Sequence, residues 1–167
     1  VRAFGIAGSD IPHALVLVGN PRRGEAALQV ALAGVKDGSR VMRLMKLDMT
    51  QLRALYQSAS LFAMPSRYEG FGLPVLEAML SRVPVLTTRC GSIPEVGGDA
   101  VEYFDGADVE GMARRIVEAV KGGYPAVALD RAAERARSFT WKRTAAGVAA
   151  VLRRTVDGRT GSEGGRR

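Results

Sequence analysis

Residues 65–79 (PSRYEGFGLPVLEAM) hold the side chains best suited to chemistry in this sequence of 167 residues. Glu69 and Glu77 are separated by seven residues, and two glycines flank Phe71 between them. Glycines let a backbone approach a ligand closely, and the free N–H groups at a helix start favour a phosphate. A carboxylate accepts hydrogen bonds from neighbouring hydroxyls of a sugar or a ribose. The pattern predicts a nucleotide-sugar site; the alternative is a strand–loop–helix joint with only a cap and a salt bridge.

Apolar runs and turn residues indicate the elements that carry this stretch. Five short apolar runs are expected to be strands, at residues 14–19, 40–47, 60–64, 84–88 and 101–104. Segments with helical spacing lie between and after them, at residues 24–34, 48–58, 72–80, 108–120, 130–138 and 141–154. Strands and helices that alternate in this way form right-handed βαβ units, so the sequence predicts an α/β fold with a Rossmann-like, doubly wound parallel sheet. Ligands of such sheets bind at the carboxyl ends of the strands.

Two helix starts are marked by residues that satisfy the free N–H groups of a first turn. Asp48 or Thr50 is expected to cap the helix through residue 58, with Leu52, Leu55 and Tyr56 on one face. Asp108 is expected to cap the helix through residue 120, in which Ile116 faces inward. These caps fix where each helix begins relative to the strand before it.

Charge is distributed unevenly along the chain. The net charge is +7, but residues 1–130 hold 14 basic and 14 acidic residues, so residues 131–167 carry all of it. We expect one domain over residues 1–155 and a disordered basic tail over residues 156–167. The tail is either a solvated end or a contact with an anionic membrane surface. No aromatic residue follows Trp141 to stack on bases, so nucleic acid is not an expected partner.

Several kinds of site are excluded by residue counts. A single cysteine, Cys90, and a single histidine, His13, exclude an intramolecular disulfide and a multi-histidine metal site. No Asp-x-Asp occurs, so we expect chemistry without a metal ion or other cofactor. No apolar run approaches the roughly 20 residues that span a bilayer. The expected location is the cytoplasm, either free or at the inner membrane surface.

Residues 55–100 carry further spaced motifs around the two glutamates. They are PS at 65–66, GFGLP at 70–74, PV at 84–85 and PEV at 94–96, and FTW follows at 139–141. This stretch resembles the signature region of the glycosyl transferases group 1, a large family of retaining enzymes with the GT-B fold. The resemblance covers residues 14–150 and implies the C-terminal, donor-binding half of that fold.

The resemblance also implies a role for particular residues. Glu69 matches the family's glutamate that contacts hydroxyls of the donor sugar, and we take it as the catalytic residue. Glu77 matches the glutamate that contacts the ribose of the nucleotide. The other residues implied to bind the donor are Arg43, Leu44, Gly70, Phe71, Gly72, Leu73 and Thr88. Met45 stands where the family often has glycine beside the base.

The family's acceptor pocket comes from an N-terminal half that we expect this chain to lack. The domain's first strand, and the basic residues after it that clamp the diphosphate, are expected to be missing as well. Arg22 and Arg23, in a strand-end loop, are either substitutes for that charge or part of a solvated turn. The resemblance implies retaining, metal-independent transfer from GDP-mannose or a UDP-sugar to an unknown acceptor, without turnover by these residues alone.

Two other classes of function stay open. One is a nucleotide-sugar-binding module without catalysis. The other is a glycoside hydrolase that uses Glu69 and Glu77 as acid and base. Both carboxylates come from one loop–helix joint, whereas a hydrolase places them on opposing walls of a cleft, so the hydrolase is the weaker alternative.

Overall fold

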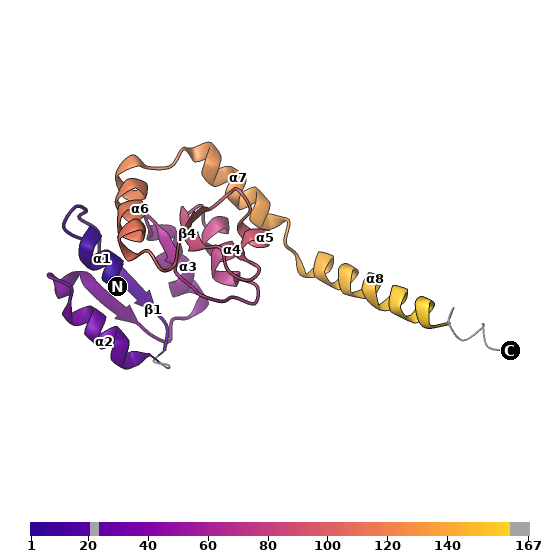
Figure 1. The fold of residues 1–167 in the computed structure, drawn as a ribbon. Coiled ribbons are helices and arrows are strands. Elements are labelled where there is room, and N and C mark those ends of the chain that lie inside the picture. Colours follow the sequence, from indigo (N-terminus) through magenta and orange to yellow (C-terminus); the bar gives the residue numbers. More distant parts are fainter. Residues whose placement is uncertain (21–23, 161–167) are drawn as a thin grey trace. The chain divides into compact units, whose positions relative to one another are not determined.

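The computed structural model describes residues 1–20 and 24–160, with side chains described up to residue 156 (Figure 1). Its strands are β1 (Leu15–Val18), β2 (Val41–Leu44), β3 (Phe62–Met64), β4 (Val85–Thr88) and β5 (Glu102–Phe104). β1 pairs with β2, β4 pairs with both β3 and β5, and every one of these pairs is parallel. The predicted α/β fold with parallel, Rossmann-like pairing is confirmed, and its hydrogen bonds are divided between a two-stranded and a three-stranded sheet.

Helices connect successive strands, as parallel pairing requires. They are α1 (Arg2–Ala7), α2 (Glu25–Ala33), α3 (Met49–Ser58), α4 (Leu73–Leu80), α5 (Ile93–Gly97), α6 (Val109–Gly122), α7 (Ala126–Arg137) and α8 (Trp141–Thr160), with a short 3-10 turn η1 (Gly38–Arg40) before β2. Both predicted caps are confirmed. Asp48 accepts a hydrogen bond from the backbone of Gln51 at 2.8 Å in a capping box, and Asp108 accepts one from Gly111 at 2.7 Å.

β2 is shorter than the apolar run that predicts it. The run extends over residues 40–47, but the strand stops at Leu44. Lys46 adopts a left-handed backbone conformation, with φ of 56°. A strand cannot continue through that conformation, so the chain turns away from the sheet before α3 begins.

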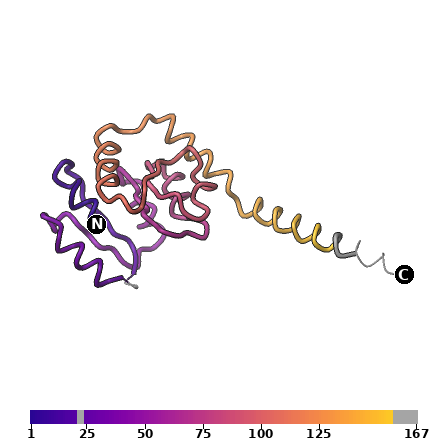
Figure 2. Tube along the Cα trace, viewed as in Figure 1, coloured from indigo at the N-terminus to yellow at the C-terminus, as the bar shows by residue number. Residues whose placement is uncertain are grey.

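One hydrophobic cluster joins segments from the two ends of the first unit, residues 1–136. Phe4 and Ile11 from the α1 region pack with Leu86 of β4 and with Ala113 and Ile116 of α6. Figure 2 shows α1 and α6 side by side, although about 100 residues separate them in the chain. The prediction that Ile116 faces inward is confirmed, since its side chain is only 8% exposed.

Arg40 fastens the segment between α1 and β1. Its guanidinium donates to the backbone carbonyl of Gly8 at 2.6 Å, to that of Ile11 at 2.5 Å and to that of His13. The same group lies 5.6 Å from the ring centroid of Phe4. One side chain therefore satisfies three carbonyls that precede β1 and holds them at the start of β2.

The second unit, residues 137–167, contains α8. The helix reaches Thr160, beyond residue 156 where a disordered tail was expected, and residues 161–167 lie outside the described residues. Trp141, Val148 and Leu152 are exposed on it. None of the helices in the described part of the chain is long and apolar enough to cross a membrane.

Candidate functional site

Glu69 and Glu77 lie on the joint that connects β3 to α4. Gly72 caps α4 in a left-handed conformation, with φ of 91°. A Cβ on this glycine would lie 2.4 Å from Cδ1 of Ile93, the first residue of α5. The close approach of α5 is therefore one reason for glycine at this position, in addition to any approach of a ligand.

The loop between β4 and α5 supports the backbone around Glu69. Gly91 has a φ of 51°, and a Cβ there would lie 2.1 Å from the backbone oxygen of Glu69. The next residue, Ser92, donates its hydroxyl to the backbone oxygen of Gly70 at 3.0 Å. The close backbone approach at Gly91 and the hydrogen bond from Ser92 hold the Glu69 loop against the β4–α5 loop.

Each glutamate carboxylate accepts a hydrogen bond from one side-chain hydroxyl. Ser66 Oγ donates to Oε1 of Glu69 at 2.7 Å. Tyr56 Oη, from α3, donates to Oε2 of Glu77 at 3.0 Å. Burial raises the pKa of Tyr56, and the hydrogen bond to Glu77 raises it further. In each case one hydroxyl uses one carboxylate oxygen, so acceptor positions are left for a ligand.

A hollow of about 660 Å³ lies at the carboxyl ends of β3, β4 and β5. The residues around it are Ser66, Arg67, Thr88, Arg89, Cys90, Tyr103, Phe104, Asp105, Gly106 and Ala107. Thr88 is buried there and donates its hydroxyl to the backbone oxygen of Ser66, so it supports the serine that holds Glu69. The guanidinium of Arg89 lies 3.9 Å from the ring centroid of Tyr103. This contact holds the positive charge of Arg89 at the edge of the hollow.

A second hollow, of about 540 Å³, lies between α3 and α4. The residues around it are Met49, Thr50, Leu52, Arg53, Tyr56, Gln57, Glu77, Leu80 and Ser81. The Glu77 carboxylate and the Tyr56 phenol thus belong to the same opening. Glu69 lines neither of the two hollows, and only its hydrogen-bond partner Ser66 lines the hollow at the strand ends.

Arg43 and Leu44 lie on β2, in the two-stranded sheet, and neither is among the residues that line the two hollows. The Arg43 guanidinium pairs with the Glu25 carboxylate through two hydrogen bonds, at 2.5 and 2.9 Å. That pairing holds the pKa of Glu25 below its ordinary value and raises the pKa of Arg43. The positive charge of Arg43 is therefore already engaged by α2.

Arg22 and Arg23, the basic residues that could supply charge beside a phosphate, lie outside the described residues. Over residues 1–20 and 24–156, no group of three or more His, Cys, Asp or Glu side chains is arranged to hold a metal ion. Of the implied donor-site residues in the loop, the side chains of Phe71 and Leu73 are exposed.

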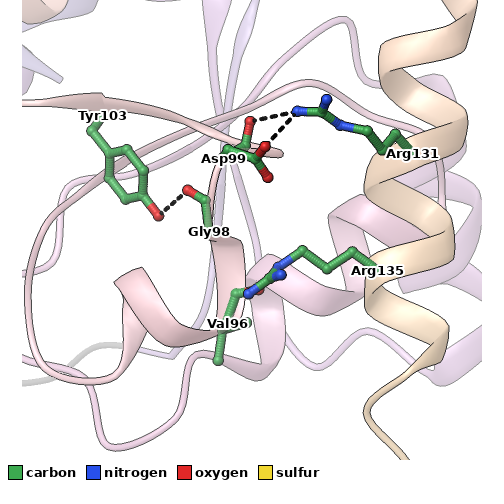
Figure 3. A network of polar contacts seen from close by, with 6 residues as sticks. All are labelled: Val96, Gly98, Asp99, Tyr103, Arg131 and Arg135. Carbon is green, nitrogen blue, oxygen red and sulfur yellow. Dashed lines mark hydrogen bonds and ion pairs between the residues drawn. The ribbon is translucent and has the colours of Figure 1, made fainter.

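Polar contacts from α7 and β5 hold α5 and the loop after it (Figure 3). Arg135 donates to the backbone oxygen of Val96 at 2.8 Å, and Arg131 donates to the Asp99 carboxylate at 2.9 Å. Tyr103 donates its hydroxyl to the backbone oxygen of Gly98 at 2.9 Å. Because α5 packs under Gly72, these contacts also fix the start of α4.

Sequence reasoning did not assign Tyr56, Ser66 or Gly91 to the site. Tyr56 was expected only on the same helix face as Leu52 and Leu55, and its partner is 21 residues away. Ser66 is three residues from Glu69 and belongs to the PS motif, so that signal was present in the sequence. Gly91 follows a strand, where glycine has several local explanations.

Solved structures share this fold. Sucrose-phosphate synthase from Thermosynechococcus elongatus matches 94% of this chain with a TM-score of 0.74 and 22% identity, over 42% of its own length. The Anabaena protein HepE, solved with UDP and glucose, matches 90% of this chain with a TM-score of 0.72 and 23% identity, over 43% of its own length. These likenesses confirm the Rossmann-like fold predicted for one half of a GT-B protein.

Two curated relatives are similar in sequence. O-antigen chain mannosyltransferase B of Escherichia coli is 40% identical over 89 residues, which are 53% of this chain and 23% of that protein. D-inositol 3-phosphate glycosyltransferase of Mycolicibacterium smegmatis is 32% identical over 159 residues, which are 90% of this chain and 36% of that protein. This chain therefore spans well under half of either relative.

The sequence profile described as glycosyl transferases group 1 matches residues 6–122. The match includes all five strands and both glutamates of the joint. The resemblance seen in the motifs is thus confirmed over most of the chain, which belongs to the glycosyl transferases group 1 family.

Proposed function

We propose that this chain binds a nucleoside-diphosphate sugar and serves retaining, metal-independent transfer of a hexosyl or mannosyl unit. The observation that carries the proposal is the joint between β3 and α4. Glu69 and Glu77 lie there around a helix start, and each carboxylate is held by one hydroxyl. The printed names of the relatives, a mannosyltransferase and an inositol phosphate glycosyltransferase, support this class of reaction.

The two glutamates have different proposed roles. Glu69 accepts hydrogen bonds from hydroxyls of the donor sugar, and Glu77 accepts them from the ribose. The backbone from Gly70 to Leu73 meets the sugar and the diphosphate. Pro74 has no N–H, and the N–H groups of Val75 and Leu76 donate to the Gly72 carbonyl, so the donors proposed at this helix start are the N–H groups of Gly72 and Leu73. These N–H groups stabilise the negative charge that develops on the leaving diphosphate. The nucleotide is UDP or GDP in the proposal, and the acceptor is left open.

The 167 residues provide one wall of a cleft in this proposal. Glycosyl transfer needs the donor positioned against an acceptor, and exclusion of water strengthens the electrostatic terms. We therefore expect these residues alone to bind a nucleotide-sugar weakly and to transfer no sugar. A dissociation constant on the order of 0.1–1 mM is expected, which corresponds to about −4 to −5.5 kcal/mol.

The α8 helix supports a further part of the proposal, contact with an anionic membrane surface on the cytoplasmic side. Val148 and Leu152 follow Trp141 at intervals of seven and four residues, which places them along one side of a helix. Lys142, Arg143, Arg153 and Arg154 add positive charge. Binding to vesicles that contain an anionic lipid, compared with neutral vesicles, tests this contact, and equal binding to both contradicts it.

Isothermal titration with UDP, GDP, UDP-glucose and GDP-mannose tests the proposal. Glu77→Ala should weaken binding of the preferred nucleotide by about 1–3 kcal/mol, because a charge-assisted hydrogen bond is lost. Glu134→Ala, which removes an exposed glutamate on α7, is the matched control and should leave affinity unchanged. Glu69→Ala should weaken binding of the nucleotide-sugar more than binding of the free nucleotide.

These titrations, together with assays of sugar transfer and of glycoside hydrolysis, separate the alternatives. Binding of nucleotide-sugars without transfer by a full-length protein favours the non-catalytic module. Hydrolysis of a simple aryl glycoside without a nucleotide favours the hydrolase. A protein that binds none of the four nucleotides contradicts the proposal.

A further inference from the structure

The hydrogen bond between Tyr56 and Glu77 joins two helices beside the hollow of about 540 Å³. The phenol comes from α3 and the carboxylate from α4, 21 residues later in the chain. The glutamate side chain alone has three rotatable bonds, so its carboxylate is not fixed by its own packing. A partner on a different helix removes much of that freedom.

The tyrosine ring is itself held in place. Its centroid lies 5.6 Å from that of Phe62 on β3, with the two rings tilted by 58°. Its side chain is half-buried against the sheet, so the position of Oη is set by packing. Since burial and the nearby Glu77 raise the pKa of Tyr56, the phenol keeps its proton at neutral pH and remains a donor.

Tyr124 and Glu102 form a second tyrosine–glutamate pair, which provides a comparison for Tyr56 and Glu77. Tyr124 Oη donates to Oε1 of Glu102 at 2.7 Å, and the guanidinium of Arg115 lies 3.7 Å from Oε2 of the same carboxylate. Both oxygens of Glu102 thus have partners. No cation pairs with Glu77 among residues 1–20 and 24–156, and the only side-chain hydrogen bond to its carboxylate in that part of the chain comes from Tyr56.

We propose that Tyr56 is a positioning residue that holds the Glu77 carboxylate so that its second oxygen, Oε1, accepts a hydrogen bond from the 2′-hydroxyl of the donor's ribose. This inference rests on the proposed function, because it assumes that Glu77 binds ribose. Tyr56 does not touch the ligand in this arrangement. It fixes the acceptor before the ligand arrives, which lowers the cost of ordering on binding.

The inference is tested by comparing nucleotides with and without the 2′-hydroxyl. UDP, 2′-deoxy-UDP, GDP and 2′-deoxy-GDP are titrated into the protein, and the ratio of ribo to deoxy affinity is measured for the base that binds. Tyr56→Phe should lower that ratio about three- to tenfold, which is the effect of one hydrogen bond, while affinity for the deoxy form stays within about twofold. Tyr124→Phe is the matched control and should leave the ratio unchanged.

A purely structural role predicts a different result. If Tyr56→Phe only loosened the packing of α3 on α4, affinity for the ribo and deoxy forms would fall together and the ratio would stay constant. That outcome overturns the inference. Glu77→Asp withdraws the carboxylate from Tyr56 without changing the tyrosine, so it provides a second variant if Tyr56→Phe does not fold. A ratio unchanged in Glu77→Asp also overturns the inference.

The outcomes distinguish this inference from the function on which it rests. If the unsubstituted protein binds none of the four nucleotides, both are wrong. If it binds the ribo forms preferentially, and Glu77→Ala removes the preference while Tyr56→Phe does not, the role of Glu77 stands and that of Tyr56 is overturned. Binding without any preference for ribose overturns the inference and the assignment of Glu77 to ribose.

Discussion

Replacing Gly91 by alanine should both destabilise the protein and displace Glu69. Two separate effects act at this position. The backbone has a φ of 51°, and a left-handed conformation costs a residue with a Cβ roughly 1–2 kcal/mol. The new Cβ would also lie 2.1 Å from the oxygen, 3.1 Å from the carbon and 3.3 Å from the nitrogen of the Glu69 backbone.

The steric part of the effect cannot be relieved by a side-chain rotation, because all three nearby atoms belong to the backbone. Contacts of a Cβ below 3.0 Å are essentially never seen, so the Glu69 loop must retreat by about 1 Å. Overpacking of this kind costs typically about 1–3 kcal/mol. Together with the conformational strain, Gly91→Ala should cost about 2–5 kcal/mol, or about 4–20 °C in melting temperature for a chain of this length.

Gly24→Ala separates the two effects. Gly24 also has a left-handed backbone, with φ of 100° and ψ of 4°, but a Cβ there meets no atom within 4 Å. This control should therefore show only the strain, roughly 1–2 kcal/mol. Differential scanning calorimetry of both variants measures the difference. Equal losses of stability would refute the claim that Gly91 is needed for the close approach to Glu69.

Binding provides a second measurement on Gly91→Ala. In the proposed function Glu69 contacts the donor sugar and Glu77 contacts the ribose. A displaced Glu69 loop should reduce affinity for a nucleotide-sugar toward that for the free nucleotide, while affinity for the free nucleotide changes less. An equal fall in both affinities would point to a general loss of structure instead.

Two further predictions concern side chains away from the glutamates. The pKa of Glu25 lies below its ordinary value of 4.5 because Arg43, and after it Gln29, donates to the carboxylate. The stabilising effect of the exposed pair with Arg43 is therefore present at neutral pH and is lost as the pH falls through the lowered pKa. Arg43→Ala should raise the Glu25 pKa toward its ordinary value in a carbon-13 NMR titration, and an unchanged pKa would contradict the pairing. Arg40→Ala leaves three backbone carbonyls between residues 8 and 13 without their charged donor, so the free energy of unfolding in urea should fall by about 2–4 kcal/mol. Arg40→Lys should give an intermediate value. A fall of less than about 0.5 kcal/mol would show that water replaces the guanidinium without cost.

Features that depend on neighbouring residues could be predicted from the sequence. The five strands follow from short apolar runs, and the caps Asp48 and Asp108 follow from the residue types that precede helices. The predicted start of α7 was wrong by four residues: helical spacing indicated residue 130, whereas the helix begins at Ala126. Pro125 precedes that helix and its carbonyl accepts the first helical hydrogen bonds, so the proline marks a beginning rather than a break.

Features that depend on distant residues could not be predicted in the same way. The helical pattern placed Tyr56 on one face with Leu52 and Leu55, but it did not indicate that Tyr56 meets Glu77. Gly91 lies 22 residues after Glu69, and only the fold brings their backbones together. The engagement of Arg43 by Glu25 was also missed, since a basic residue at a strand end suggests a ligand as readily as an ion pair. Hydrophobic periodicity gives the inward face of an element and leaves its partner undetermined.

The packing of α1 on α6 has a consequence for how the chain folds. Phe4 belongs to a cluster completed by Ala113 and Ile116, so this part of the core forms only after more than 100 intervening residues are in place. Contacts between such distant residues are slow to form, because loop-closure entropy is lost before they stabilise anything. During synthesis, the part of α1 that packs on α6 stays uncovered until α6 leaves the ribosome. At the N-terminal to C-terminal pace of translation, about 5–20 residues per second, that interval lasts several seconds or longer, a window in which chaperones would bind the nascent chain.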